Sequence, residues 1–304
     1  MTKRLLPLAL AAARATALFT AALFTATLFT AALITAAPAQ AAPTHASPSS
    51  TVDVSVTSDG FTAPATVAPG EVTLNVSATD PEGAWIGLVR LRPGISLAEY
   101  LDDLTTAFAG GPGSGEASRE VEHDVTAHGG LAVLDGRSAS AAQFLAPGAY
   151  LLLDYKDVGR DGLAAKVREL RVGGRWSASA PASARVNVVM YQTGGGARFA
   201  APSRIPAGAP VRVTNLSAQF NEAIWMPLAD GLDGTDVAAW FAGTSQAYPF
   251  TGGPSGMVVL SPGRTQVVDV DLAPGRYALV SWAHDYETGE FHAAQGMHAV
   301  VDLV

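Results

Sequence analysis

The chain of 304 residues has room for two domains of ordinary size, and only 15% of its residues are charged. It contains no cysteine, which excludes both disulfides and thiolate metal ligands. Its formal net charge of −8 argues against nucleic acid and anionic membrane surfaces as partners.

The N-terminal segment, residues 1–41, has the pattern of a secretory signal peptide. Lys3 and Arg4 precede a long apolar run, and the small residues of Ala39-Gln40-Ala41 then suit signal-peptidase cleavage. Cleavage there would remove three basic residues and no acid, which changes the formal net charge from −8 to −11. We therefore expect a secreted, extracellular protein with no membrane segment after cleavage. An uncleaved membrane anchor is the alternative, because the apolar run is long enough to span a bilayer.

The remaining chain is predicted to contain an internal duplication, that is, two domains of the same kind. Residues 42–50 form a flexible stem, 51–173 a first domain, 174–184 a Ser/Ala-rich linker and 185–304 a second domain. Leu145-Ala146-Pro147-Gly148-Ala149-Tyr150 in the first domain matches Leu272-Ala273-Pro274-Gly275-Arg276-Tyr277 in the second. A second match, Gly60 to Pro64 with Arg198 to Pro202, comes in the same order. Two ordered matches favour a duplication over coincidence.

Short segments that alternate at period two predict an all-β fold. In the first domain Val52, Val54 and Val56 alternate with polar residues, and Pro-Gly pairs mark turns between such segments. Ser96 and Glu99 form a capping box at the start of a helix in the first domain. A weaker helix is expected after Thr235 in the second domain, and Gly-Pro-rich loops are expected at 110–115 and 252–256. The predicted architecture is two Greek-key β-sandwich domains, each with a short helical insertion.

The last segment resembles the copper loop of a cupredoxin, the β-sandwich of blue copper proteins. It runs from Ala273 to Trp282 and continues with His292 to Met297. The resemblance implies tandem cupredoxin-like domains. A blue copper site uses a cysteine thiolate, two histidines and a weak axial methionine.

The resemblance also implies that the copper ligands are largely lost. Asn221 stands where the first histidine is expected and Ser281 where the cysteine is expected, while His292 and Met297 keep the other two positions. These four residues are vestigial copper-site positions. In the first domain all four ligands are missing. The residues there are Ala84, Asp154, and those around Ala165 and Leu170.

A different metal site in the last loop is the alternative. His284, His292, Met297 and His298 supply imidazole and thioether groups that suit copper. Since Met297 and His298 are neighbours in a predicted strand, their side chains should point to opposite faces. The competing interpretation is that His292 and Met297 serve packing and loop hydrogen bonds, while His284 and His298 are solvated.

Catalytic motifs are absent from the sequence. It has no His-x-His pair of a multicopper oxidase, no Gly-x-Ser-x-Gly elbow and no Walker loop. His123 and His128 are interpreted as loop residues. The sequence therefore predicts a secreted, non-enzymatic cupredoxin-like protein without a cofactor, a binding or structural module of the cell envelope whose extracellular partner is unknown. The alternatives are a copper-handling protein and an enzyme on the same scaffold.

Overall fold

The structure of the chain, a computed structural model, describes residues 50–304. The predicted leader and nearly all of the predicted stem lie outside the described residues. Two large β-sheets and a few short helices make up the described residues, so the predicted all-β fold class and its β-sandwich architecture are confirmed. Within residues 50–304 no helix combines the length and apolar character needed to cross a membrane.

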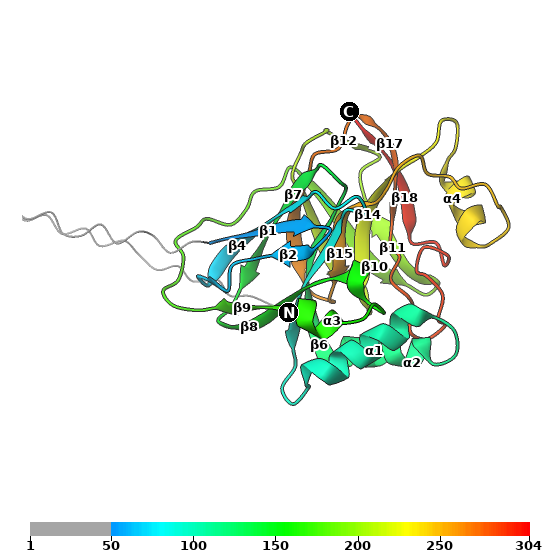
Figure 1. The fold of residues 1–304 in the computed structure, drawn as a ribbon. Coiled ribbons are helices and arrows are strands. Elements are labelled where there is room, and N and C mark those ends of the chain that lie inside the picture. Colours follow the sequence, from blue (N-terminus) through cyan, green and yellow to red (C-terminus); the bar gives the residue numbers. More distant parts are fainter. Residues whose placement is uncertain (1–49) are drawn as a thin grey trace, which may run out of the picture. The chain divides into compact units, whose positions relative to one another are not determined.

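The two halves of the chain contribute similar series of elements (Figure 1). The first half contains β1 (Thr51–Thr57), β2 (Gly60–Thr62), β3 (Thr66–Val67), β4 (Gly70–Ala78), β5 (Ala84–Leu91), α1 (Leu97–Ala109), α2 (Ser114–Asp124), β6 (Val125–Val133), β7 (Ser138–Leu145), β8 (Gly148–Asp154), the 3₁₀ turn η1 (Tyr155–Asp157), α3 (Leu163–Lys166) and β9 (Arg168–Val172). The second half contains β10 (Val186–Thr193), β11 (Gly196–Ala200), β12 (Arg204–Ile205), β13 (Val211–Leu216), β14 (Asn221–Pro227), α4 (Gly234–Phe241), β15 (Ser255–Leu260), β16 (Thr265–Val270), β17 (Gly275–Val280) and β18 (His298–Leu303).

In each sheet, strands of the second half lie at one end and strands of the first half at the other. From each end towards the middle, equivalent strands of the two halves follow in the same order. The 8-stranded sheet runs β11-β10-β13-β16-β7-β4-β1-β2, and the 10-stranded sheet runs β12-β18-β17-β14-β15-β6-β5-β8-β9-β3. Strand β10 pairs parallel with β13 just as β1 pairs parallel with β4. The internal duplication inferred from sequence is therefore visible in the topology.

Both sheets continue from one half of the chain into the other. Strand β7 pairs with β16 in the 8-stranded sheet, and β6 pairs with β15 in the 10-stranded sheet. Residues between β9 and β10 form no regular element, which is the place of the predicted 174–184 linker. The domain boundaries themselves stay a prediction.

Two apolar cores follow from the alternation of the strands. Val52, Val54 and Val56 are at most 2% exposed and belong to the core between the two sheets. A second core includes Tyr100 and Leu104 of α1 and buried residues of the 10-stranded sheet. The 10-stranded sheet is thus covered on both faces, and its outer face is where α1 and α2 pack.

The first helical insertion is larger than the sequence indicated. The Ser96 side chain accepts from the Glu99 amide at 3.1 Å and the Glu99 carboxylate accepts from the Ser96 amide, which confirms the capping box of α1. The loop expected at 110–115 instead leads directly into α2, which lies beside α1 (Figure 1). The expectation that His123 and His128 are loop residues is wrong, because His123 lies in the last turn of α2 and His128 is a buried residue of β6.

Candidate functional site: a hydrogen-bonded pair and a carboxylate-bearing cavity

Asn221 and Ser281 meet in the interior of the second unit. Asn221 begins β14, Ser281 directly follows β17, and both are fully buried. The Ser281 hydroxyl donates to Asn221 Oδ1 at 2.9 Å and accepts from the Glu222 amide at 3.1 Å. The Asn221 amide in turn donates to Ser217 Oγ at 2.8 Å. The polar groups at these two positions therefore satisfy one another without a metal ion.

His292 and Met297 lie on the loop that returns to the same point. The Met297 amide donates to the His292 carbonyl at 2.9 Å, and the Ser281 amide donates to the Met297 carbonyl at 3.4 Å. His292 is 2% exposed and Met297 is fully buried. The structure thus brings Ser281, His292 and Met297 together through the backbone, and Asn221 through a side chain. That these are remnants of a copper site stays a prediction.

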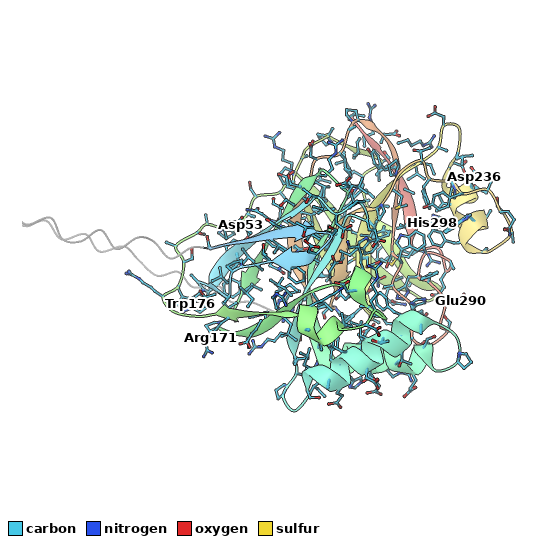
Figure 2. The ribbon with its side chains drawn as sticks, in the orientation of Figure 1. Asp53, Arg171, Trp176, Asp236, Glu290 and His298 are labelled. Atoms are coloured by element: carbon cyan, nitrogen blue, oxygen red, sulfur yellow. The ribbon has the colours of Figure 1, made fainter. Side chains whose placement is uncertain are left out.

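The other two predicted metal positions lie apart from Met297. His284 stacks on Phe291 with 4.3 Å between the ring centroids. His298 begins β18 beside α4, which carries Asp236 (Figure 2). Met297 belongs to the core between the sheets, so the strand alternation turns His298 to the opposite face. Among residues 50–304, no three His, Cys, Asp or Glu side chains cluster as a metal site would require.

The donor set around Ser281 does not fit a blue copper centre. Ser281 and Asn221 offer a hydroxyl and an amide, where a blue copper centre needs a thiolate and an imidazole. Both groups already hydrogen-bond to each other, to Ser217 and to the Glu222 amide. His292 is different, because neither of its buried ring nitrogens has a hydrogen-bond partner. Burial lowers the pKa of His292 to about 4, although Asp285 opposes this shift, so the imidazole is neutral.

Strand registers relate this site to its counterpart in the first half. The equivalent pairs are Gly87↔Leu153 in the first half and Ile224↔Val280 in the second. The residues that follow Leu153 and Val280 are Asp154 and Ser281, which are therefore counterparts. The residues three positions before Gly87 and Ile224 are Ala84 and Asn221, which are counterparts in the same way. The registers thus agree with the sequence alignment of the two halves at these positions.

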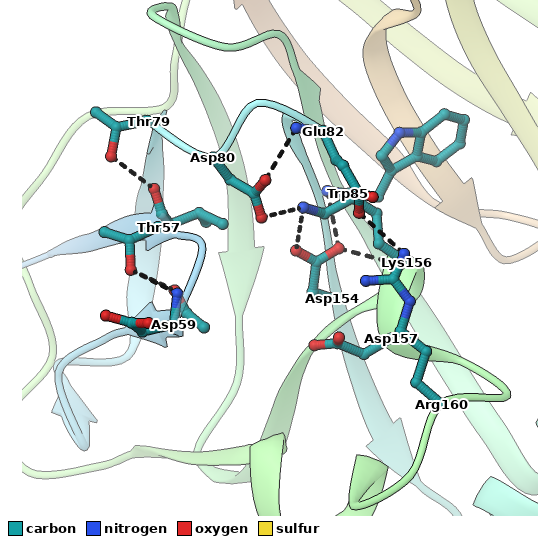
Figure 3. Close-up of polar contacts among 12 residues, drawn as sticks. Thr57, Asp59, Thr79, Asp80, Glu82, Trp85, Asp154, Lys156, Asp157 and Arg160 are labelled. Carbon is teal, nitrogen blue, oxygen red and sulfur yellow. Dashed lines mark hydrogen bonds and ion pairs between the residues drawn. The ribbon is translucent and has the colours of Figure 1, made fainter.

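In the first half a lysine ammonium lies beside Asp154, the counterpart of Ser281. Asp154 accepts from the Trp85 amide at 3.1 Å, as Ser281 does from the amide of Glu222. Lys156 Nζ lies 3.6 Å from Asp154 and 2.8 Å from Asp80 (Figure 3). Burial raises the pKa of Asp154, and its bond to the Lys156 amide and the Lys156 charge oppose the rise. This site therefore contains an internal cation that is shared by two carboxyl groups, Asp80 and Asp154.

The sequence analysis aligned Met297 with a residue around Leu170 in the first half, and the strand registers contradict this alignment. Tyr150↔Leu170 and Tyr277↔Val301 are equivalent pairs in the two halves. Leu170 therefore corresponds to Val301 and not to Met297. Lys166 stands as many residues before Leu170 as Met297 stands before Val301, but it ends α3 and lies outside the paired strands. Lys166 forms an ion pair with Asp157 at 2.6 Å. The sequence argument failed here because the loop before β9 is shorter than the loop before β18.

A cavity of about 300 Å³ lies on the outer face of the 10-stranded sheet. Residues of β5, β14, α1, α2 and the segment after β17 line it. Its walls are mainly aromatic and aliphatic, but they also carry the carboxyl groups of Glu122 and Glu222. The sequence analysis missed this cavity. The signal was Glu222, the one acid of β14, which directly precedes the apolar run from Ala223 to Met226 and is buried with it.

Both carboxyl groups are held in an environment that disfavours charge. Glu222 is 5% exposed, and its Oε2 accepts from the Trp282 amide at 3.1 Å. Glu122 Oε1 accepts from the Phe220 amide at 2.8 Å. Burial raises the pKa of each glutamate to about 7. Each can therefore exchange a proton near neutral pH.

Solved structures similar to this chain include auracyanin of Roseiflexus castenholzii, with 19% identity over 40% of this chain and 99% of that protein at a TM-score of 0.25. A copper nitrite reductase from Nitrosomonas europaea is 12% identical over 84% of this chain and 93% of its own, at a TM-score of 0.24. A multicopper oxidase is 11% identical over 84% of this chain and 88% of its own, at 0.23. No protein-family model and no curated protein matches the chain. At these values the fold assignment rests on the topology described above.

Proposed function

We propose that the chain is a secreted, non-enzymatic protein with cupredoxin-like units that functions as a binding module of the cell envelope. One observation carries this proposal, the hydrogen bond between Ser281 and Asn221, which the resemblance to cupredoxins aligns with the cysteine and the first histidine of a copper site. Two groups that satisfy each other in a buried site need no metal to be stable. The signal-peptide pattern of residues 1–41 supports export.

The absence of catalytic motifs from the sequence supports a non-enzymatic role. A type 2/type 3 copper cluster is held by several His-x-His pairs, and the chain contains none. The Ser281 hydroxyl is fully buried and accepts from a backbone amide, so it lacks both the access and the partner base of a nucleophile. An extracellular or envelope partner is therefore proposed in place of a substrate.

A second candidate function is copper handling through the His/Met residues of the last loop. The observation that favours it is the buried imidazole of His292, whose two ring nitrogens have no hydrogen-bond partner. An unpartnered neutral imidazole together with the Met297 thioether would suit Cu(I). His284 and His298 are the other members of this candidate set.

Metal titration separates the two candidates. Purified protein is titrated with Cu(II), Cu(I) and Zn(II) in a calorimeter, alongside the variants His292→Leu and Met297→Leu and the matched control His123→Asn at an exposed position. The binding-module proposal expects no stoichiometric binding in any of them. Binding of one equivalent that is lost in both loop variants and kept in the control would establish copper handling instead.

A further inference from the structure

The cavity on the outer face of the 10-stranded sheet has an aromatic entrance. Phe108 of α1 is 52% exposed and Phe291 is 36% exposed, and both line the cavity. Phe108 stacks on Tyr155, and Phe291 packs against Trp282 with ring centroids 5.7 Å apart. Large aromatic side chains left half-exposed around a hollow are typical of ligand sites.

The side chains of the cavity wall that can carry a charge are acidic. All the residues that line it are described by the structure, and none of them is lysine or arginine. Burial lowers the pKa of His284, so this imidazole is neutral at ordinary pH. The groups that can carry charge there are Glu122 and Glu222. An organic anion would therefore meet like charge with no basic group to pair with.

Glu222 lacks a partner on the side of the cavity. Its Oε2 accepts from the Trp282 amide, but no described residue donates a hydrogen bond to Oε1. No lysine or arginine forms an ion pair with it in the described part of the chain, whereas Glu122 has Arg92 nearby. A buried carboxylate without a compensating cation is costly to the fold. A cationic ligand would supply both the missing donor and the missing charge.

We propose that this cavity binds a small organic cation, whose ammonium group donates to Glu222 and whose apolar body packs between Trp85 and Trp282. Ammonium groups bind well to a desolvated carboxylate and over the faces of tryptophan rings. The volume of about 300 Å³ suits a small amine rather than a peptide or a sugar chain. This inference deepens the proposed binding function and names a ligand class for it.

A matched ligand series tests the sign of the charge. The probes are 2-phenylethylammonium, the neutral 2-phenylethanol and the anionic 3-phenylpropanoate, which are similar in size and differ in charge. Calorimetry and tryptophan fluorescence at about pH 8, above the pKa of Glu222, follow binding. We expect the cation to bind at one site and at least about tenfold more tightly than either analogue. Equal binding of the neutral or anionic probe, or no binding of the cation, would overturn the inference.

Variants assign the binding to Glu222. Glu222→Gln keeps the size of the side chain and should weaken the cation at least about tenfold while leaving the neutral probe unchanged. Glu169→Gln changes an exposed acid of β9 and should bind as the parent does. If Glu222→Gln does not fold, Trp85→Leu replaces it and should weaken the cation more than the neutral probe. A folded Glu222→Gln protein that binds the cation as tightly as the parent contradicts the proposal.

The outcome is separable from that of the copper titration. Copper binding that is lost in His292→Leu and Met297→Leu would refute the copper-free proposal without testing the cation site, because neither His292 nor Met297 is among the residues that line the cavity. Failure of the cation to bind would remove the ligand class and leave the hydrogen bond between Ser281 and Asn221 as evidence for a copper-free protein.

Discussion

Glu222→Gln should make the protein more stable at alkaline pH than the parent. The glutamate is 5% exposed, and burial raises its pKa from the ordinary value of 4.5 to about 7. Glutamine has the same shape, still offers an oxygen to the Trp282 amide, and cannot ionise. The variant therefore removes the cost of burying a negative charge and changes little else.

The sign and size of the effect follow from proton linkage. A carboxyl group with a raised pKa holds its proton in the folded state where the unfolded chain has already lost it. Stability is thus full below pH 4.5, falls as the pH rises towards about 7, and is level above that. The interval between the two values corresponds to about 3 kcal/mol, at about 1.4 kcal/mol for each pH unit.

Urea unfolding followed by circular dichroism measures this difference. We expect parent and variant to be equally stable near pH 4.5, and the variant to be more stable by about 3 kcal/mol at about pH 8. Glu122, whose pKa burial also raises to about 7, titrates in both proteins and cancels in the comparison. Glu169→Gln, at an exposed position, should follow the parent at every pH. A variant-minus-parent difference that does not change with pH would refute the reasoning.

Three further predictions address export and the hydrogen-bonded pair. N-terminal sequencing of protein from culture medium should begin near Ala42, and a membrane-bound product that keeps Met1 would show that the leader is an anchor. Ser281→Ala should lower the free energy of unfolding by about 2–6 kcal/mol in urea titrations, because Asn221 Oδ1 and a backbone amide each lose a buried partner; Ser138→Ala, at an exposed position, should change it little. The double variant Asn221→His and Ser281→Cys should bind Cu(II) with an intense thiolate charge-transfer colour, and a folded variant that binds copper no better than the parent contradicts the alignment.

Local patterns predicted the parts of the fold that depend on local chemistry. The capping box of Ser96 and Glu99 needs only residues three apart, and the alternation of Val52, Val54 and Val56 needs only one strand. Helix α2 was missed because it begins inside a Gly-rich segment, and Gly113 at its start provides no side-chain cap. Sequence signals failed where the local chemistry was weak.

The two candidate sites also differ in whether local sequence patterns could predict them. Repeated turn motifs predicted the alignment of Asp154 with Ser281, since each lies six residues after the glycine of its Pro-Gly pair, Gly148 or Gly275. The cavity could not be predicted in this way, because Tyr100, Glu222 and Trp282 are far apart in sequence and meet only when β14, β17 and α1 pack. Its one local signal is an acid in an apolar strand.

The two sites share strands but face opposite sides of the sheet. Asn221 and Glu222 are neighbours at the start of β14, so their side chains point to opposite faces. Ser281 and Trp282 repeat this arrangement after β17, where Ser281 donates to Asn221 and the Trp282 amide donates to Glu222. One face therefore holds a polar pair that is satisfied internally, while the other holds a carboxylate that is not. A carboxylate without a partner cation constrains a ligand more strongly than a satisfied polar pair does. Under the proposed binding function, the search for a ligand therefore belongs at the cavity and not at Asn221 and Ser281.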